Sequence, residues 1–421
     1  MHHFHYTNNE LYCENVPVSE ITAKLGTPLY LYSRATLMRH FQTFDDGFSD
    51  IGHLTCFAVK SCSNLAILQQ FAAMGAGADI VSGGELFRAL KAGIDPKKII
   101  YSGVGKTEAE IREALFADIL LFNVESPQEL DWLQKLAAEL GTTAPVSFRI
   151  NPDVDPKTHA YISTGLAKNK FGIPVDEALE EYIRAHAMNN VEILGVSCHI
   201  GSQLTQIEPF LEALNKVKNF VGRLQEKGID IRYLDLGGGL GITYNDEEPP
   251  PPQAYAEAII KEMQNMDCTL ILEPGRVIVG NAGILLTEVQ YTKVNSGGEK
   301  EKRFVIVDAA MNDLARPTLY GAYHEIQPVK QTDAPLQMVD VVGPICETGD
   351  FMARDRKLPQ VRQGDLLAIM SSGAYGFTMS SNYNSRPRAA EVLIDDDEVH
   401  IIRRREDYDD LIQGEVLLKL P

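Results

Sequence analysis

The sequence predicts an α/β fold in which a (β/α)8 TIM barrel is joined to a C-terminal β-sandwich or β-barrel domain. Short apolar runs alternate with helix-like segments over about the first two thirds of the chain, and strand-like runs then follow one another from about Ala282. The length of 421 residues is more than one ordinary domain needs. We therefore expect one large domain and one smaller domain.

Eight short runs rich in apolar and β-branched residues are the expected barrel strands. Segments with helical periodicity, such as "SPQELDWLQKLAAELG", lie between them. Eight alternating units within roughly 230 residues are typical of a barrel, whose chemistry lies at the carboxyl ends of its strands. An open flavodoxin-like sheet also alternates but rarely has eight units. The runs are "TCFAVK", "ADIVS", "KIIYSG", "ILLFNV", "PVSFRI", "EILGVSCHIG", "IRYLDL" and "TLILEP".

The strand-like runs after Ala282 are separated by turns and contain almost no helical pattern. They include "ILLTEVQYTKV", "RFVIVDA", "LQMVDVVG", "DLLAIMSS", "AAEVLIDD" and "EVHIIRR". The N-terminal run "TPLYLYS" is expected to add one more strand to this domain. The predicted organisation is an N-terminal segment at 1–34 that contributes to the β-domain, a barrel at 35–281 and the C-terminal β-domain at 282–421.

The formal net charge of −19 argues against nucleic acid or an anionic membrane surface as a partner. The start "MHHFHYTNNELYC" has no apolar core of the signal-peptide type, and the chain has no run of about 18 apolar residues. These features predict a cytoplasmic protein. The six cysteines have neither metal-ligand spacing nor the density of a disulfide scaffold, so we expect reduced cysteines and no metal site.

Polar residues fall where the expected barrel strands begin or end. Lys60 ends the first strand and Asp79 opens the second. Arg149 closes the fifth strand, His199 the sixth and Glu273 the eighth. A lysine at such a point is usually only a solvated strand end. The other polar residues expected at the same mouth of the barrel favour a functional role for Lys60 instead.

A glycine cluster, "LDLGGGLG", directly follows the seventh strand, in the region where barrels commonly bind phosphate through backbone N–H groups. A tight turn explains three glycines equally well. The neighbouring loops add Ser202 from "HIGSQ", and Glu273 and Arg276 from "EPGR". A phosphate site, a lysine that can form a Schiff base, a histidine that can stack and a carboxylate together suggest pyridoxal phosphate. A carboxylate on the pyridine nitrogen makes the ring a strong electron sink, which suits loss of carbon dioxide.

Seven motifs in order carry a resemblance to a known family: "FAVK", "HIGSQ", "GGGLG", "EPGR", "RPTLY", "CETGD" and "GAYGFTMSSNYNSRP". Across nearly the whole chain, the sequence resembles the barrel-type (fold type III) pyridoxal phosphate-dependent decarboxylases, and among them those that act on meso-2,6-diaminopimelate. The resemblance implies a carboxy-lyase that forms L-lysine and CO2, the last step of lysine biosynthesis. It also implies reaction at the D-configured centre and a homodimer whose two active sites are shared between the subunits.

The resemblance implies a role for each matching position. Lys60 is the Schiff-base lysine, His199 stacks on the ring face and Glu273 contacts the ring nitrogen. Cys346 is the acid that reprotonates the carbanion, and Glu347 accepts the distant ammonium group of the substrate. The remaining cofactor contacts that the resemblance implies are Asp79, Arg149, Ser202, Gly238, Gly239, Gly275, Arg276 and Tyr375.

The substrate end is expected to lie in the β-domain. Arg316 and Tyr320 in "ARPTLY", together with Arg276, are the expected contacts of the substrate's remote carboxylate, and Tyr375 is a further expected substrate contact. Two arginines favour a diacid, whereas an acidic partner would suit ornithine better. Each assignment has a plain alternative, since an arginine before proline often pairs with a surface carboxylate and a lone cysteine is usually just buried.

Three rival functions remain open on the sequence. A related barrel-type decarboxylase acting on arginine, ornithine or carboxynorspermidine shares most motifs, and "RPTLY" with "CETGD" argues against the first two. An alanine racemase shares the architecture but normally has arginine rather than glutamate on the ring nitrogen. A non-catalytic binding protein with this fold is expected to lack the lysine or the acidic cysteine, whereas this chain has Lys60 and Cys346.

Overall fold

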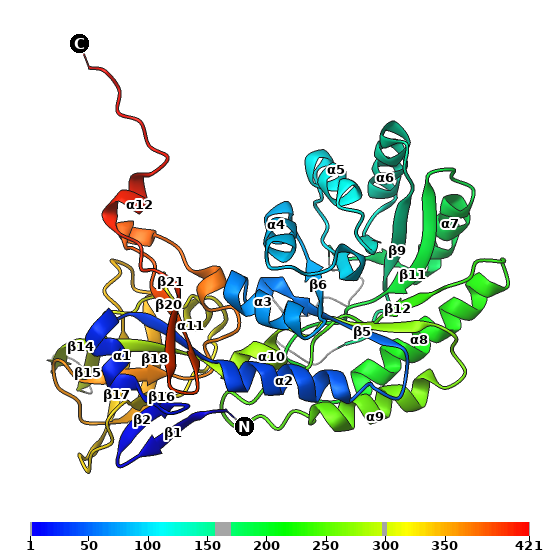
Figure 1. Ribbon diagram of the computed structural model, residues 1–421. Coiled ribbons are helices and arrows are strands. Elements are labelled where there is room, and N and C mark those ends of the chain that lie inside the picture. The colour runs from blue at the N-terminus through cyan, green and yellow to red at the C-terminus, as the bar shows by residue number, and fades with distance from the viewer. Residues whose placement is uncertain (1, 156–169, 297–300, 421) are drawn as a thin grey trace. The chain divides into compact units, whose positions relative to one another are not determined.

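The computed structural model describes residues 2–155, 170–296 and 301–420. The chain divides into two compact units: Met1–Leu37 together with Val279–Pro421, and Met38–Ile278. The first of these is a β-domain and the second is a barrel (Figure 1). No helix within these described stretches is both long and apolar enough to cross a membrane.

Eight parallel strands form the barrel. They are β5 (His53–Ala58), β6 (Gly77–Ile80), β7 (Ile99–Tyr101), β8 (Leu121–Val124), β9 (Ala144–Asn151), β11 (Val191–Ser197), β12 (Tyr233–Asp235) and β13 (Thr269–Leu272). β13 pairs with β5, with Leu270 opposite His53, and this pairing closes the ring. The short β10 (Ile173–Pro174) pairs with β9 outside the ring. The predicted barrel is therefore confirmed, and each of the eight predicted runs overlaps one of its strands.

Helices alternate with the strands and lie around the barrel (Figure 1). They are α2 (Arg34–Asp46), α3 (Leu65–Ala73), α4 (Gly83–Lys91), α5 (Glu108–Phe116), α6 (Pro127–Leu140), α7 (Val175–His186), α8 (Glu208–Gln225), α9 (Pro252–Met263) and α10 (Arg276–Val279), with 3₁₀ turns η1 (Val59–Ser61) and η2 (Pro96–Lys98). Ser82, Thr107 and Ser126 each cap a helix by accepting a hydrogen bond from the backbone N–H three residues on. These caps satisfy N–H groups that have no partner inside the helix, so each helix begins directly after its loop.

Apolar side chains from β5, β7, β8, β11 and β13 form one buried cluster. Its members are Cys56, Ile100, Leu121, Leu194 and Ile271. Because these residues lie before the carboxyl ends of their strands, the apolar packing leaves the last residues of the strands and the following loops to form the polar mouth.

Among the described residues, the β-domain is built on a nine-stranded sheet and a small three-stranded sheet. The large sheet contains β4 (Leu29–Ser33), β14 (Gly283–Asn295), β15 (Lys302–Val307), β16 (Ile326–Pro328), β17 (Leu336–Val342), β18 (Phe351–Pro359), β19 (Leu366–Ile369), β20 (Ala390–Asp395) and β21 (Glu398–Arg403). The small sheet contains β1 (Phe4–Thr7), β2 (Glu10–Cys13) and β3 (Val16–Pro17). The helical segments of this unit are α1 (Val18–Leu25), α11 (Arg316–Tyr320), α12 (Tyr408–Ile412), η3 (Gly280–Ala282), η4 (Phe377–Met379) and η5 (Tyr383–Ser385).

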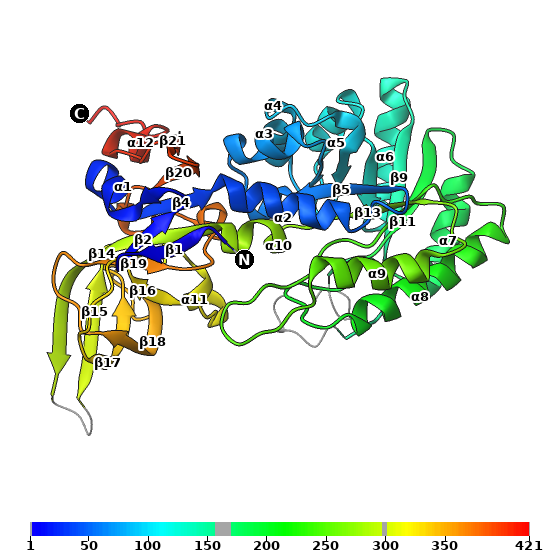
Figure 2. The ribbon, with the colours of Figure 1, turned by 60° about the horizontal axis from the view of Figure 1, so that its bottom comes forward.

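The N-terminal strand β4 lies inside the large sheet, between β14 and β20 (Figure 2). All of its residues are buried, and Leu29 and Leu31 pack with Ile284, Leu286 and Val392 in the core of this unit. The prediction that an N-terminal strand joins the β-domain is therefore confirmed.

Some elements were not anticipated from the sequence. They are β16, β18 and the strands β1–β3 of the small sheet. The middle of β18 carries four charged residues at successive positions, from Arg354 to Lys357, so the strand lacks the apolar alternation by which a strand is recognised. Its pairing with β17 supplies the backbone partners that the side-chain pattern does not predict.

Candidate active site

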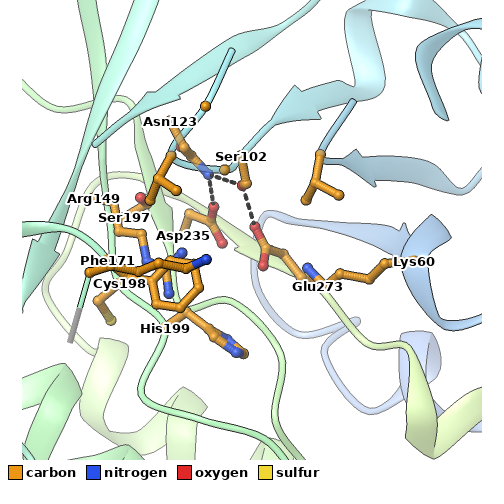
Figure 3. A pocket seen from close by; sticks show the side chains of 15 residues that line it. Lys60, Ser102, Asn123, Arg149, Phe171, Ser197, Cys198, His199, Asp235 and Glu273 are labelled. Atoms are coloured by element: carbon orange, nitrogen blue, oxygen red, sulfur yellow. Dashed lines mark hydrogen bonds between the residues drawn. The ribbon is translucent and has the colours of Figure 1, made fainter. Parts of the chain in front are cut away.

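A cavity of about 410 Å³ lies at the carboxyl ends of the barrel strands (Figure 3). Its walls are Lys60, Val81, Ser102, Gly103, Val104, Gly105, Asn123, Arg149, Lys170, Phe171, Ser197, Cys198, His199, Asp235 and Glu273. Residues from distant parts of the sequence meet here because parallel strands all end at the same edge of the barrel. Four of the predicted site residues, Lys60, Arg149, His199 and Glu273, lie in these walls.

Lys60 lies in η1, beyond the end of β5, rather than at the end of the strand itself as predicted. Its Nζ is 2.5 Å from Asp79 Oδ2. Asp79 does not open β6 but is its third residue, and it is fully buried. Its other oxygen, Oδ1, is buried without a hydrogen-bond partner in the described part of the chain. A buried carboxylate therefore fixes the position of the lysine amine.

Glu273 and Asp235 form a buried carboxylate pair next to Asp79. Asn123 Nδ2 donates to Asp235 Oδ2 at 2.8 Å and to Ser102 Oγ at 3.0 Å, and Ser102 Oγ lies 3.5 Å from Glu273 Oε1 (Figure 3). Burial raises the pKa of Glu273 well above its usual range, and the charges of Asp235 and Asp79 raise it further. Such a cluster favours a positively charged or proton-bearing group in the cavity.

His199 follows β11 and presents a neutral ring to the site. The backbone N–H of Gly238 donates to its Nδ1 at 3.2 Å, so Nδ1 carries no proton. Burial lowers the pKa of His199 well below its ordinary value, and the positive charges of Arg149 and Lys60 lower it further. The ring is therefore uncharged at neutral pH, with its proton on Nε2.

The glycines after β12 bring bare backbone to the edge of the site. A Cβ at Gly238 would lie 2.1 Å from the carbonyl oxygen of Glu273. Gly239 has φ of +119°, and a Cβ there would lie 2.4 Å from the carbonyl oxygen of Gly201. Side chains are thus excluded at both positions, and the close approach of this loop to its neighbours depends on glycine.

Ser202 and Arg276 meet beside these glycines. Arg276 Nη2 donates to Ser202 Oγ at 3.1 Å, and its Nη1 donates to Tyr244 Oη at 2.7 Å. Gly275, which precedes Arg276, packs against Ser61, because a Cβ at Gly275 would lie 2.9 Å from Ser61 Oγ. This hydroxyl, guanidinium and phenol are donors of the kind that bind phosphate oxygens.

Arg149 is held at the cavity wall by Glu125. Arg149 Nη1 donates to Glu125 Oε1 at 3.0 Å, and the guanidinium carbon lies 4.7 Å from the centre of the Phe171 ring. Arg149 Nη2 is buried and has no hydrogen-bond partner within the described residues. Arg149 lies inside β9, two residues before the end of that strand.

The five other predicted site residues belong to the β-domain. Arg316 and Tyr320 are the first and last residues of α11, and Arg316 is buried. Cys346 and Glu347 lie in the turn between β17 and β18, and Tyr375 lies in the loop before η4. Thr318 Oγ1 donates to the carbonyl oxygen of Gly349 at 2.7 Å, which ties α11 to that turn. The cysteine's own backbone N–H donates to Asn384 Oδ1 at 2.9 Å.

The residues around the barrel cavity fit pyridoxal 5'-phosphate. The carboxylate cluster suits a protonated ring nitrogen, the amine of Lys60 suits an aldehyde, and the glycine loop with Ser202 suits a phosphate. The orphaned Asp79 Oδ1 and Arg149 Nη2 are polar atoms that the protein alone leaves unsatisfied. Within the described residues, no group of three or more His, Cys, Asp or Glu is arranged to hold a metal ion.

Comparison with known proteins agrees with this fit. Residues 34–280 match the family described as "Pyridoxal-dependent decarboxylase, pyridoxal binding domain", so the fold and site are those of a pyridoxal-dependent decarboxylase. The chain is 55% identical to the diaminopimelate decarboxylase of Pseudomonas aeruginosa over 415 residues, which is 99% of each chain. It belongs to the diaminopimelate decarboxylase family.

Solved structures of diaminopimelate decarboxylases also match this chain. A crystal structure of diaminopimelate decarboxylase from Helicobacter pylori complexed with L-lysine has a TM-score of 0.91 at 45% identity, covering 94% of this chain and 98% of that one. A diaminopimelate decarboxylase from M. jannaschii in co-complex with L-lysine has a TM-score of 0.93 at 41% identity, covering 99% and 98%. The resemblance inferred from the motifs is therefore confirmed.

Several cavity residues were not predicted. Asn123 and Ser102 each lie in or after an apolar run, where a single polar residue is usually taken as structural. Asp235 stands in "LDLGGG", directly before the predicted glycine cluster, and its position was a signal that could have been used. Tyr244, the partner of Arg276, lies outside these walls in the loop before α9 and was not predicted either.

Proposed function

We propose that this protein catalyses the pyridoxal 5'-phosphate-dependent decarboxylation of meso-2,6-diaminopimelate to L-lysine and CO2. The observation that carries the proposal is the 55% identity over 99% of both chains to a diaminopimelate decarboxylase. The barrel cavity supports it, because it combines the amine of Lys60 with the carboxyl group of Glu273.

When bound, pyridoxal phosphate supplies an aldehyde that joins the substrate amine and a ring that accepts the electron pair left by departing CO2. Lys60 holds the aldehyde before substrate arrives, and Asp79 keeps its Nζ in place. Glu273 holds a proton at the ring nitrogen, since its own raised pKa and its acidic neighbours favour a shared proton there. His199 stacks its neutral ring on the cofactor without adding a charge that opposes the ring proton.

The phosphate is assigned to the glycine loop and to donors around it. Gly238 and Gly239 let the backbone approach the phosphate closely because they have no side chain. Ser202 contributes a hydroxyl group that Arg276 orients. Tyr375 is assigned to the same phosphate on the basis of the resemblance. Arg149 and Gly275 complete the proposed set of cofactor contacts, Arg149 through its buried Nη2.

Cys346 is assigned as the acid that delivers a proton from Sγ to the carbon that loses CO2. Its thiol is exposed in this chain, and Asn384 fixes the backbone of its turn. Glu347, the next residue, is assigned to the distant ammonium group of the substrate. Tyr383 forms a hydrogen bond with Glu347, which raises the pKa of that tyrosine.

The remote carboxylate of the substrate is assigned to Arg316 and Tyr320, with Arg276. A guanidinium binds a carboxylate through charge-assisted hydrogen bonds, which ornithine and arginine cannot use because they have no remote carboxylate. Glu273 separates the proposal from an alanine racemase, in which arginine normally faces the ring nitrogen. The combination favours decarboxylation of a diacid.

Replacing Arg316 by alanine is expected to lower kcat/KM for meso-diaminopimelate by roughly 10- to 100-fold, because a charge-assisted contact contributes about 1.5 to 3 kcal/mol. The matched control is Arg303→Ala, which removes a half-exposed arginine of the same domain that pairs with Glu301. The measurement is kcat/KM of both variants by steady-state kinetics. An Arg316→Ala enzyme as efficient as the wild type would contradict the diacid assignment.

We further propose that the active protein is a homodimer whose sites combine the barrel of one subunit with the Cys346 turn of the other. The support is the family resemblance and the assignment of catalytic residues to both compact units. A closed two-fold dimer then carries two equivalent shared sites. The cytoplasmic location expected from the sequence is part of the proposal, and cell fractionation tests it.

Shared sites predict complementation between two inactive variants. Lys60→Ala and Cys346→Ala proteins, unfolded together and refolded as an equal mixture, should give about half mixed dimers, each with one site free of both changes, so roughly a quarter of wild-type activity should return. Each variant refolded alone is the control and should stay inactive. If verified mixed dimers show no activity, Cys346 acts in the site of its own chain.

The proposed activity is tested by CO2 release from purified protein with pyridoxal phosphate. The substrates are meso-diaminopimelate, ornithine, arginine and carboxynorspermidine, each at equal concentration. The proposal predicts release from meso-diaminopimelate with an efficiency well above that of the others. Preferred release from any of the other three would replace the assigned substrate.

A further inference from the structure

A histidine outside the proposed set of site residues contacts Arg316. His324 lies between α11 and β16 and is completely buried, and Arg316 is 6% exposed. Arg316 Nη1 is 2.7 Å from His324 Nε2, and His324 Nδ1 is 2.8 Å from the carbonyl oxygen of Met370. The ring thus bridges the arginine and the backbone at the end of β19.

These two contacts define the protonation state of His324. A guanidinium has N–H donors and no acceptor, so His324 Nε2 must accept the hydrogen bond from Arg316 and carries no proton. A carbonyl oxygen only accepts, so His324 Nδ1 must donate to Met370 and carries the proton. The imidazole is therefore neutral, with a single tautomer that both partners require.

A neutral acceptor orients Arg316 in a way that a carboxylate would not. A carboxylate at this position would neutralise the guanidinium and compete with a carboxylate ligand, whereas an imidazole nitrogen directs one N–H and leaves the positive charge intact. His324 is itself fixed, because its carbonyl oxygen accepts from Arg356 Nη1 at 2.7 Å and Met370 N donates to the carbonyl oxygen of Glu325 at 2.8 Å.

We propose that His324 is a positioning residue that holds the Arg316 guanidinium, still charged, in the orientation that receives the remote carboxylate of the substrate. The inference rests on the proposed function, in which Arg316 binds that carboxylate. It makes His324 a determinant of the preference for a diacid, although His324 acts through Arg316 rather than through contact with the substrate.

Two conservative variants separate this role from a purely structural one. His324→Asn places an amide N–H near the position of Nδ1, so it keeps the donor to Met370 but is too short to reach Arg316. His324→Gln places an amide oxygen near the position of Nε2, so it keeps the acceptor for Arg316 but not the donor to Met370. If His324 has only a structural role, the bond to Met370 matters most and His324→Asn should be closer to the wild type. If His324 positions Arg316, His324→Gln should be closer to the wild type.

The measurements are KM and kcat for meso-diaminopimelate, the dissociation constant of L-lysine, which retains the remote carboxylate, and the thermal midpoint of the holoenzyme. His324→Asn is expected to raise KM and the lysine dissociation constant by about tenfold with a much smaller change in kcat. His324→Gln is expected to stay within about threefold of the wild type on both.

The effects of Arg316→Ala and His324→Asn on KM must also be non-additive. In the Arg316→Ala background, His324→Asn is expected to raise KM no further, because the group that it positions is gone. Equal KM values for wild type and His324→Asn, or a full additional effect in the double variant, would overturn the inference. If wild-type protein does not decarboxylate meso-diaminopimelate, the proposed function fails; if it does and Arg316→Ala raises KM while His324→Asn does not, the inference alone fails.

Discussion

Lys60→Ala is expected to lose nearly all turnover, by more than roughly 10³-fold, and to lose the long-wavelength absorption of covalently held cofactor. The amine of Lys60 lines the barrel cavity, and the fully buried Asp79 holds it 2.5 Å away, although the lysine side chain itself is 34% exposed. Alanine removes the group that binds the aldehyde and leaves the buried Asp79 carboxylate without that partner. Absorption spectra and CO2 release on the same preparation test both effects.

Lys97→Ala is the matched control, because Lys97 belongs to the same barrel but forms an exposed ion pair with Asp118. That variant should keep the spectrum and the activity of the wild type, since exposed pairs contribute little. A Lys60→Ala protein that retained both the absorption band and turnover would show that another group holds the cofactor.

Glu273→Gln is expected to lower kcat by roughly 10²- to 10³-fold while the protein still binds the cofactor. Glutamine keeps the size of the side chain but cannot hold the negative charge that favours a proton at the ring nitrogen. The effect should fall on kcat more than on KM, because the charge matters most when the electron pair of the broken bond is accepted. Steady-state kinetics and the spectrum of the bound cofactor give the two readouts.

Glu273→Asp is the companion variant, because it keeps the carboxyl group and shortens its reach by one methylene. It should retain more activity than Glu273→Gln if charge matters more than exact position. A Glu273→Gln enzyme with wild-type kcat would remove the strong electron sink from the account and reopen the racemase alternative.

The barrel was predictable because each of its strands is a short apolar run bounded by helical segments, and closure needs only their number and order. β18 was not predictable from the sequence, because most of its charged side chains face solvent and hide the strand pattern. Its backbone pairing with β17 defines it as a strand. Lys60 and Asp79 lie slightly off their predicted positions, since η1 follows β5 and Asp79 is not the first residue of β6. Such local geometry depends on tertiary contacts that the pattern does not contain.

The site was predictable where a residue with a distinctive group follows a barrel strand within two residues of its end, as Lys60, His199 and Glu273 do. Asn123 was missed because its contact with Asp235 joins strands far apart in the sequence, whereas Asp235 directly precedes the predicted glycine cluster and carried a local signal that was not used. His324 was missed for a related reason: a histidine eight residues after Arg316 is unremarkable until the turn of the chain brings Nε2 to the guanidinium. Side-chain partners across a fold have to be seen in three dimensions.

The central claim is that this protein replaces one carboxylate of meso-diaminopimelate with hydrogen. The most direct measurement is mass spectrometry of the products formed by the holoenzyme in D2O. The expected product is lysine that carries one non-exchangeable deuterium, at the carbon that lost its carboxylate, with one CO2 released per lysine. Diaminopimelate that gains deuterium at an α-carbon without forming lysine or CO2 would contradict the claim, because it would show proton exchange of the racemase type instead of decarboxylation.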